Sequence, residues 1–484
     1  MNPETLTPEM LLERPCACHS PAFARIAHGM AAGLTRRGLG RSIAAAAAAS
    51  TVLTCEAFAE VTDKPIRFTN VRIFDGRSSQ LIDGRDVLVS GGKIEALVPR
   101  TEQVAVAEVL DGGGGVLMPG LVDAHWHSML VAIPQSVAMT ADLGYIHLLA
   151  GQEAERTLLR GFTTVRDVGG PSFALKRAID EHRLAGPRIY PSGAMISQTG
   201  GHGDFRMRYE IPRSPQTSLS RAEEAGVSAL ADGEAEVLQR VREQLLLGAS
   251  QIKIMAGGGV SSLYDPIDGM QFTPAEIRAA VAAASDWGTY VCAHVYTSAG
   301  VQRAIENGVR SIEHGQLADE ATVRRIVDTD TWWSIQPFLM DEDANPKSTP
   351  EQQRQQRLIA EGTVRAFELG KKHRAKMVWG TDILFDASKA QTQGKQLAKL
   401  ARWFEPAEVL RMATSRSGEL LALSGERNPY PGALGVITPG AWADILVVAG
   451  NPLDDLGLLA RPEETLTTIM KEGRIIKRNP PQSV

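Results

Sequence analysis

Between residues 119 and 430 the chain alternates short apolar segments with stretches of helical periodicity. Eight apolar segments are typical of buried strands: Leu121–His127, Phe162–Val168, Arg188–Ile196, Gln251–Met255, Tyr290–Val295, Arg310–His314, Thr331–Gln336 and Lys376–Asp382. Helical patterns separate most of them, among them Glu234–Leu247, Pro274–Trp287, Ser298–Asn307 and Thr349–His373. Because this alternation favours a parallel sheet and eight units favour closure, the sequence predicts an α/β fold, a (β/α)8 TIM barrel.

Two loops interrupt the regular spacing of this region. They cover residues 197–233, which include the glycine-rich Thr199–Asp204, and residues 340–350. Loops of this length in a compact domain are commonly functional. We therefore expect both loops to form walls of a substrate pocket.

Segments typical of short strands also flank the barrel on both sides. Glycine-rich turns separate the segments before it and after it, which are Ile66–Phe74, Asp86–Val98, Gly115–Leu117, Gly435–Ile437, Ala443–Val448 and Thr467–Ile476. We expect residues 60–118 and 431–484 to pair into one composite β-sandwich, with the barrel of residues 119–430 inserted between them. A chain of 484 residues with 43% hydrophobic content has room for both.

The first 59 residues have the pattern of a twin-arginine-type signal peptide. An arginine pair in Thr35–Leu39 precedes the apolar run Ile43–Leu53, and Ala57-Phe58-Ala59 is a site of the kind that signal peptidases cut. The run is shorter than the roughly 20 residues that cross a bilayer. We therefore expect an exported protein, periplasmic or secreted, without membrane attachment after cleavage. A lipoprotein anchored through Cys55 ranks second, and Met30 is the more conventional start.

The cysteine positions and the net charge argue against a disulfide-bonded protein, a cysteine metal site and a nucleic-acid-binding protein. Cys16, Cys18 and Cys55 fall in the removable segment, so Cys292 alone remains and no intrachain disulfide can form. Cys16 and Cys18 have no second pair nearby with which to bind a metal. A net charge of −5 and a pI near 6.1, without a basic stripe, argue against nucleic-acid binding.

Histidines stand where strands are expected to end, and barrels of this kind carry their catalytic residues at strand ends. His125 and His127 end the first strand, and alternate residues of a strand face the same side, so both imidazoles can bind one metal ion. His294 and His314 end the fifth and sixth strands. Either one alone is more simply a hydrogen-bonded core histidine, but two at equivalent positions favour metal ligands.

Asp382 and Lys253 complete a set of six residues. Asp382 ends the last apolar strand, where a carboxylate is costly to bury unless it is paired or bound to metal. Lys253 ends the fourth strand, where an ammonium beside two divalent ions would be repelled. Carbamylation by CO2 would convert it into a carboxylate-like group able to bridge two metals. A lysine paired with an acid is the alternative.

In order and setting, these residues resemble the metal-dependent amidohydrolase superfamily. The resemblance rests on Pro119–His127 followed by Lys253, His294, His314 and Asp382, and it covers nearly all of the chain after the signal. Four further segments resemble the branch of Xaa-Pro dipeptidases and ochratoxin-degrading amidohydrolases, with an especially close likeness to bacterial ochratoxin A hydrolases: Thr163–Asp167, Thr199–Gly203, Lys253–Gly259 and His294–Tyr296.

The resemblance implies a binuclear centre with two Zn2+ per subunit, although cobalt, manganese or iron also suit such ligands. His125, His127 and Asp382 would hold the more buried ion, His294 and His314 the more exposed ion, and carbamylated Lys253 would bridge the two. A hydroxide between the metals would attack the amide, and Asp382 would transfer its proton to the departing amine.

The resemblance also implies a small-molecule substrate with a free carboxylate next to the scissile amide. His202 and Tyr296 would contact that carboxylate and the carbonyl oxygen, and Arg166 would assist, unless it pairs with Asp167. The leading hypothesis is carboxypeptidase-like hydrolysis of an N-acyl amino acid, such as ochratoxin A to ochratoxin α and phenylalanine. An Xaa-Pro dipeptidase ranks second, and a non-catalytic binding protein of the same fold ranks third. Relatives assemble symmetrically, so we expect a homo-oligomer, with an octamer among the alternatives.

Overall fold

The computed structural model describes residues 65–210, 217–260, 264–345, 347 and 349–479. The expected export signal, with Cys16, Cys18, Met30 and Cys55, lies outside these ranges. Within them, no helix combines the length and the apolar character that crossing a membrane requires.

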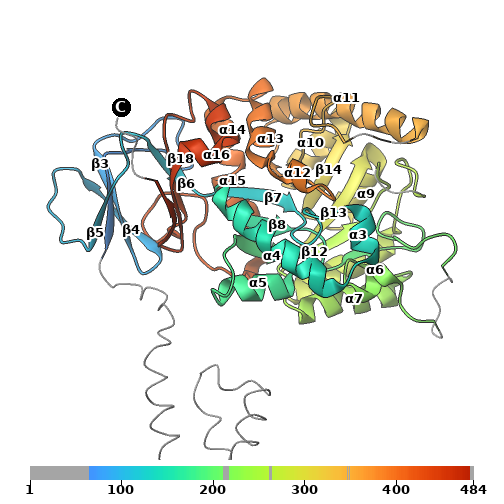
Figure 1. Cartoon of the computed structure of the whole chain (residues 1–484). Coiled ribbons are helices and arrows are strands. Elements are labelled where there is room, and N and C mark those ends of the chain that lie inside the picture. The colour runs from blue at the N-terminus through green and yellow to red at the C-terminus, as the bar shows by residue number, and fades with distance from the viewer. Residues whose placement is uncertain (1–64, 211–216, 261–263, 346, 348, 480–484) are drawn as a thin grey trace, which may run out of the picture. The chain divides into compact units, whose positions relative to one another are not determined.

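Parallel strands alternate with helices through the middle of the chain, as the sequence predicts (Figure 1). These strands are β7 (Leu121–Trp126), β8 (Phe162–Asp167), β9 (Arg188–Pro191), β10 (Met195–Ser197), β11 (Ser228–Leu230), β12 (Ile252–Met255), β13 (Val291–Thr297), β14 (Ser311–Leu317), β15 (Trp332–Ile335) and β16 (Met377–Trp379). They form one sheet in the order β11-β10-β12-β13-β14-β15-β16 and another in the order β7-β8-β9.

Backbone hydrogen bonds connect the two sheets at two places, through residues in a strand or directly beside one. Ser250, just before β12, donates to the Pro191 carbonyl of β9 at 2.8 Å, and Asp382, just after β16, donates to the His125 carbonyl of β7 at 2.9 Å. The closure of one eight-stranded barrel stays a prediction.

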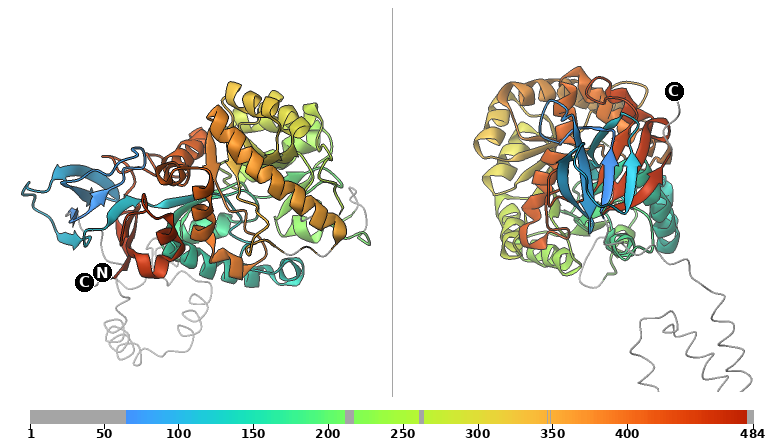
Figure 2. Two further views of the ribbon diagram at one scale, coloured as in Figure 1. Left: turned by 90° about the horizontal axis from the view of Figure 1, so that it is seen from above. Right: turned by 90° about the vertical axis from the view of Figure 1, so that its left-hand side faces the viewer.

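The helices lie around the parallel strands in Figures 1 and 2. They are α3 (Gln135–Thr140), α4 (Leu143–Leu159), α5 (Phe173–Asp180), α6 (Arg221–Glu224), α7 (Glu234–Leu246), α8 (Pro274–Asp286), α9 (Ser298–Glu306), α10 (Glu320–Asp328), α11 (Pro350–His373), α12 (Ala387–Ala390), α13 (Gln393–Ala398), α14 (Pro406–Met412), α15 (Ser415–Leu421) and α16 (Pro462–Thr465), with 3-10 turns at η3 (Lys399–Arg402), η4 (Ala422–Arg427) and η5 (Leu456–Ala460). The ends of α7, α8, α9 and α11 confirm the four expected helices to within one residue, because caps such as Thr273 and Thr349 define where helices begin.

The third expected strand, Arg188–Ile196, is broken in two. Gly193 separates β9 from β10 with a φ of +72°, and a Cβ there would lie 2.3 Å from the Gln244 side-chain oxygen. Only glycine tolerates both conditions, so the chain turns at this point and enters the larger sheet. The expected polar loop 197–233 is also partly wrong, because Ser220 and Glu223 form a capping box that starts α6, and β11 follows.

Strands from both ends of the chain share a sheet. The peripheral strands are β1 (Ile66–Thr69), β2 (Arg72–Ile73), β3 (Arg85–Ser90), β4 (Lys93–Pro99), β5 (Glu108–Asp111), β6 (Val116–Pro119), β17 (Ile445–Val448), β18 (Leu466–Lys471) and β19 (Arg474–Arg478). They form the sheets β4-β3-β1-β5 and β19-β18-β17-β6-β2, and β6 pairs antiparallel with β17. The pairing of the two ends is therefore present, whereas the sandwich and its boundaries stay predictions.

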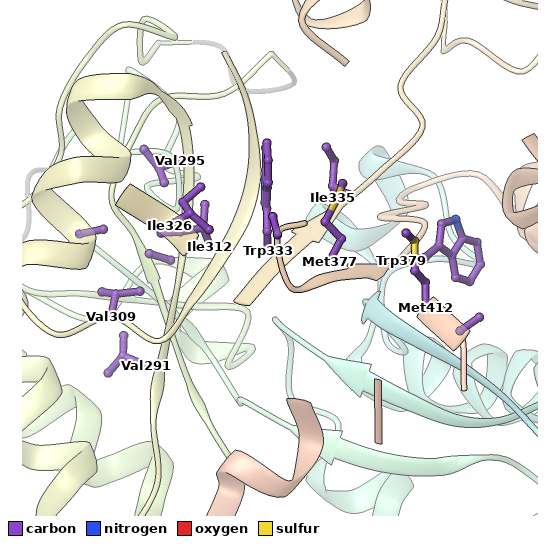
Figure 3. Packing of buried hydrophobic residues seen from close by; sticks show 14 of the residues in the cluster. Val291, Val295, Val309, Ile312, Ile326, Trp333, Ile335, Met377, Trp379 and Met412 are labelled. Carbon is purple, nitrogen blue, oxygen red and sulfur yellow. The ribbon is translucent and has the colours of Figure 1, made fainter. Parts of the chain in front are cut away.

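The core beside β13 to β16 packs strands against helices (Figure 3). Strand residues such as Val295, Trp333 and Trp379 are fully buried there with Ile326 of α10 and Met412 of α14. Burial of apolar surface drives this packing. The Trp333 indole nitrogen also donates to the His314 carbonyl at 2.6 Å, so the core holds the backbone of an expected metal ligand.

Candidate metal centre and active site

The six residues expected to bind metal line one cavity of about 450 Å3. They come from distant parts of the chain: His125 from β7, His127 just after it, Lys253 from β12, His294 from β13, His314 from β14, and Asp382 from the turn after β16. His202 and Tyr296 line the same cavity, but Arg166 does not.

The separations of the donor atoms suit a metal ion. Asp382 Oδ1 lies 3.3 Å from the Nε2 atoms of both His125 and His127, and Asp382 Oδ2 lies 4.0 Å from His314 Nε2. One donor atom each from His125, His314 and Asp382 falls within 4.8 Å of the others. Donors of a tetrahedral ion with bonds of about 2.0–2.1 Å are about 3.3 Å apart. The arrangement around Asp382 therefore fits a divalent cation.

The protonation states also suit metal binding. Burial holds the pKa values of His294 and His314 well below the ordinary histidine value, so both rings are neutral. Burial alone would raise the pKa of Asp382, but the neighbouring His125 and His127 outweigh it and keep that pKa well below its usual range. Neutral imidazoles and an ionised carboxylate are the forms that coordinate metals.

Each of the four histidines uses one ring nitrogen to bond a protein oxygen. His125 Nδ1 lies 2.8 Å from Glu313 Oε2, His127 Nδ1 lies 2.9 Å from the Gly169 carbonyl, His294 Nε2 lies 3.2 Å from the Gly258 carbonyl, and His314 Nδ1 lies 2.7 Å from Gln336 Oε1. A carbonyl or carboxylate oxygen only accepts, so the ring nitrogen donates in each case. The other ring nitrogen is therefore left as the metal-binding atom.

Arg166 lies away from the cavity, beneath His125. Its side chain is fully buried, its Nη2 donates to both Glu313 carboxylate oxygens at 2.7 Å, and its Nε donates to the Ala124 carbonyl at 2.6 Å. The expected pairing with Asp167 is also absent, because adjacent strand residues face opposite sides. Asp167 instead accepts from the backbone of Ser128. The position of Arg166 thus contradicts the expected contact with substrate.

The Lys253 side chain is buried and lines the same cavity as the other candidate ligands. Desolvation by burial lowers its pKa, although the charges of Glu313 and Asp382 oppose that shift. Within the described residues no carboxylate forms an ion pair with its ammonium at 4.0 Å or less. The alternative of a lysine paired with an acid finds no support in this geometry, and carbamylation stays a prediction.

His202 and Tyr296 pack on the ligand rings. The His202 ring stacks on His294 with centroids 4.1 Å apart, and its Nδ1 lies 3.2 Å from Asp265 Oδ2. The Tyr296 ring lies 4.9 Å from that of His314. Burial raises the pKa of Tyr296 well above its ordinary value, so its phenol stays protonated and can donate a hydrogen bond.

Two of the candidate ligands have unusual backbone conformations. His314 has a φ of +77° and Asp382 a φ of +52°, values in the left-handed region that non-glycine residues seldom adopt. Strain of this kind commonly accompanies functional sites, because the surrounding structure must maintain it. Both residues line the cavity.

A second cavity of about 590 Å3 adjoins the first, and both are lined by Gln135, Val260, Tyr296 and Asp382. Segments of both expected loops line these cavities, and the binding of substrate there stays a prediction. Residues 202 and 204–207 line the first cavity, and residues 341, 343–345, 347 and 349 line the second. The first is mostly apolar, with Leu130, Met139, Met195, Phe205, Met255, Leu384 and Phe385.

Three residues of the site were missed from the sequence: Glu313, Gln336 and Asp265. Glu313 had a usable signal, since it is an acid inside an apolar strand directly before a candidate ligand. Gln336 ends the seventh strand segment without any distinguishing pattern, and Asp265 lies in a loop. Their roles depend on contacts with residues 22 to 188 positions away.

Several known proteins are similar to this chain. The model of the amidohydrolase family matches residues 116–476. Ochratoxinase of Aspergillus niger is 29% identical over 386 residues, which cover 75% of this chain and 76% of that protein. A crystal structure of an amidohydrolase is 36% identical with a TM-score of 0.77, covering 86% of this chain and 99% of the other. A prolidase complexed with N-methylphosphonate-L-proline is 31% identical with a TM-score of 0.78, covering 86% and 100%.

Proposed function

This chain belongs to the amidohydrolase family, and we propose that the amide bond it hydrolyses is that of an N-acyl amino acid. It is a hydrolase of amide bonds, and the family generally uses divalent metals. The observation that carries the proposal is the single cavity in which six candidate ligands meet His202, Tyr296 and an apolar wall. Such a cavity suits an apolar group joined to a polar, hydrolysable bond.

Two divalent ions, zinc by default, would be held by His125, His127 and Asp382 and by His294 and His314, with Lys253 as a carbamate between them. Bound there, they would polarise the amide carbonyl and lower the pKa of the attacking water. We also propose that the strands close into an eight-stranded barrel, because a closed barrel brings the strand ends together around the metals.

Asp382 would move the proton. Its carboxylate lies 3.3 Å from two histidine nitrogens and lines both cavities, so it can reach water and the leaving group. It would take a proton from the attacking water and deliver it to the amine nitrogen as the carbon–nitrogen bond breaks.

His202 and Tyr296 would orient the substrate. The protonated Tyr296 phenol would donate to the carbonyl oxygen, and His202, held by Asp265, would contact the substrate carboxylate. Lys347 lines the second cavity, where burial lowers the pKa of its ammonium and the charge of Asp382 opposes that shift. It would supply the cationic contact that Arg166 is too deeply buried to make.

The substrate is tested by direct comparison. Zinc-loaded protein would be incubated with ochratoxin A, N-benzoyl-L-phenylalanine and the dipeptides Met-Pro and Gly-Pro, and free phenylalanine or proline measured by mass spectrometry. We expect faster release of phenylalanine, because the apolar wall suits a bulky acyl group. Asp382→Asn is the matched inactive control.

An Xaa-Pro dipeptidase is the second candidate, and the similarity to a prolidase over 86% of this chain favours it. Faster release of proline would establish it in place of the first. If no compound is cleaved faster than in buffer, both substrate proposals fail. Less than one zinc per chain, with no added mass on Lys253, would support a non-catalytic protein instead.

A further inference from the structure

Charge distinguishes one of the four candidate histidine ligands from the other three. His127, His294 and His314 donate to neutral oxygens of Gly169, Gly258 and Gln336. His125 alone donates to a carboxylate, Glu313. A carboxylate behind a histidine raises the basicity of the metal-binding nitrogen more than a carbonyl does, because its negative charge stabilises positive charge on the ring.

Glu313 is held in place through both oxygens. Oε2 accepts from His125 and Arg166, and Oε1 accepts from Arg166 and from the Ser311 hydroxyl at 2.7 Å. The Glu313 side chain is fully buried, so water cannot replace these donors. One Arg166 nitrogen, Nη2, lies 2.7 Å from both carboxylate oxygens, and a charge-assisted hydrogen bond of this kind favours the ionised carboxylate.

Arg166 extends the same arrangement to the backbone. Its Nε donates to the carbonyl of Ala124, the residue directly before His125, at 2.6 Å. One buried cation therefore orients both the carboxylate behind the imidazole and the strand that carries it. Arg166 and Glu313 are positioning residues, since neither lines the cavity.

On the basis of the two-metal centre of the proposed function, we propose that Glu313 makes the two metal positions unequal. It would strengthen binding at the position formed by His125, His127 and Asp382 relative to the position formed by His294 and His314. The charge of Glu313 also reaches His314 and Lys253 through space. The direct hydrogen bond to His125 makes the first position the more sensitive one.

Two opposite substitutions test the inference on apoprotein titrated with Zn2+ against a chromophoric chelator. Glu313→Gln keeps the acceptor and removes the charge, so we expect the tighter of two zinc equivalents to weaken 10- to 100-fold. The affinity of the other equivalent should change by less than about 10-fold, because its histidines keep their own hydrogen-bond partners. Gln336→Glu places a carboxylate behind His314 and should tighten the weaker equivalent. The readout is metal affinity, so it does not depend on substrate.

Combining Glu313→Gln with His127→Ala shows which of the two metal positions Glu313 affects, because His127→Ala removes a ligand from the first position. In that background, Glu313→Gln should have little further effect on the remaining zinc. Circular dichroism of the apoproteins controls for folding. If Glu313→Gln does not fold, the zinc affinity of Gln336→Glu alone tests the inference. Equal weakening of both equivalents by Glu313→Gln, or no tightening by Gln336→Glu, would overturn the inference.

Discussion

At the residue scale, the candidate metal centre depends on a glycine that tolerates no added atom. Gly380 follows β16, and a Cβ built there would lie 2.5 Å from the backbone nitrogen and the Cβ of His125. His125 is part of a buried strand, so it cannot move away without displacing its imidazole. The glycine thus permits the close approach of the turn that carries Asp382 to the strand that carries His125.

Gly380→Ala should therefore reduce the zinc content and lower kcat/KM by about 10-fold or more, because misplaced ligands lose their reactive geometry. Gly144→Ala is the control, because Gly144 is exposed in the first turn of α4 and a Cβ there meets nothing within 4 Å. That change should stabilise the fold by about 0.5–1 kcal/mol. Metal analysis and thermal unfolding measure both effects, and wild-type zinc content in Gly380→Ala would contradict the expectation.

Cys292 gives a second prediction at this scale. Its thiol is fully buried on β13, and burial raises its pKa to about 12. Because alkylation needs an accessible thiolate, iodoacetamide at pH 8 should not modify Cys292 in the native protein and should modify it in guanidinium. Peptide mass spectrometry distinguishes Cys292 from Cys16, Cys18 and Cys55. Rapid native labelling would mean that β13 opens readily.

At the element scale, β9 is joined to the C-terminal strands by a buried arginine. The Arg188 Nε atom donates to Asp444 at 3.0 Å, its Nη1 pairs with Glu472, and its guanidinium lies 3.9 Å from the Trp442 ring centroid. Since Arg188 belongs to the parallel strands and Asp444 directly precedes β17, this contact links the expected barrel to the sheet shared by both chain ends.

Arg188→Met should destabilise the fold by about 3–5 kcal/mol, because it leaves Asp444 buried without its counter-ion. Chemical denaturation measures this loss. Arg177→Met is the matched control. Arg177 of α5 pairs with Glu181 directly after it, and both side chains are exposed, so solvent screens the pair. The denaturation midpoint of this variant should therefore equal that of the wild type. Equal midpoints for both variants would show that the Arg188 contact contributes no stability.

At the scale of the whole molecule, the candidate ligands come from distant parts of the chain, and His125 and Asp382 are 257 positions apart (382 − 125). Any ion bound only by the folded chain stabilises it by mass action, by about 2.7 kcal/mol at 100 times the dissociation constant. Dialysis against a chelator should therefore lower Tm, and added zinc should restore it. His125→Ala should show a smaller response, and a wild-type Tm that is insensitive to the chelator would argue against a metal centre.

Much of the site was predictable because parallel strands end at the same edge. His125, His294 and His314 were identified from their place at the ends of apolar segments, and they do line one cavity. The expected contact of Arg166 with the substrate carboxylate is wrong, because its side chain is buried against Glu313 and does not line the cavity. Its true partner, Glu313, is 147 residues away, and no local pattern relates the two.

The sequence alone determined the alternation of strands and helices and the six candidate ligands, because periodicity and side-chain chemistry act over a few residues. Tertiary structure alone decided the break of the third strand at Gly193, the burial of Arg166 and the oxygen behind each histidine. Those features arise from contacts between segments far apart in the chain, where packing and the pairing of buried charge select one arrangement.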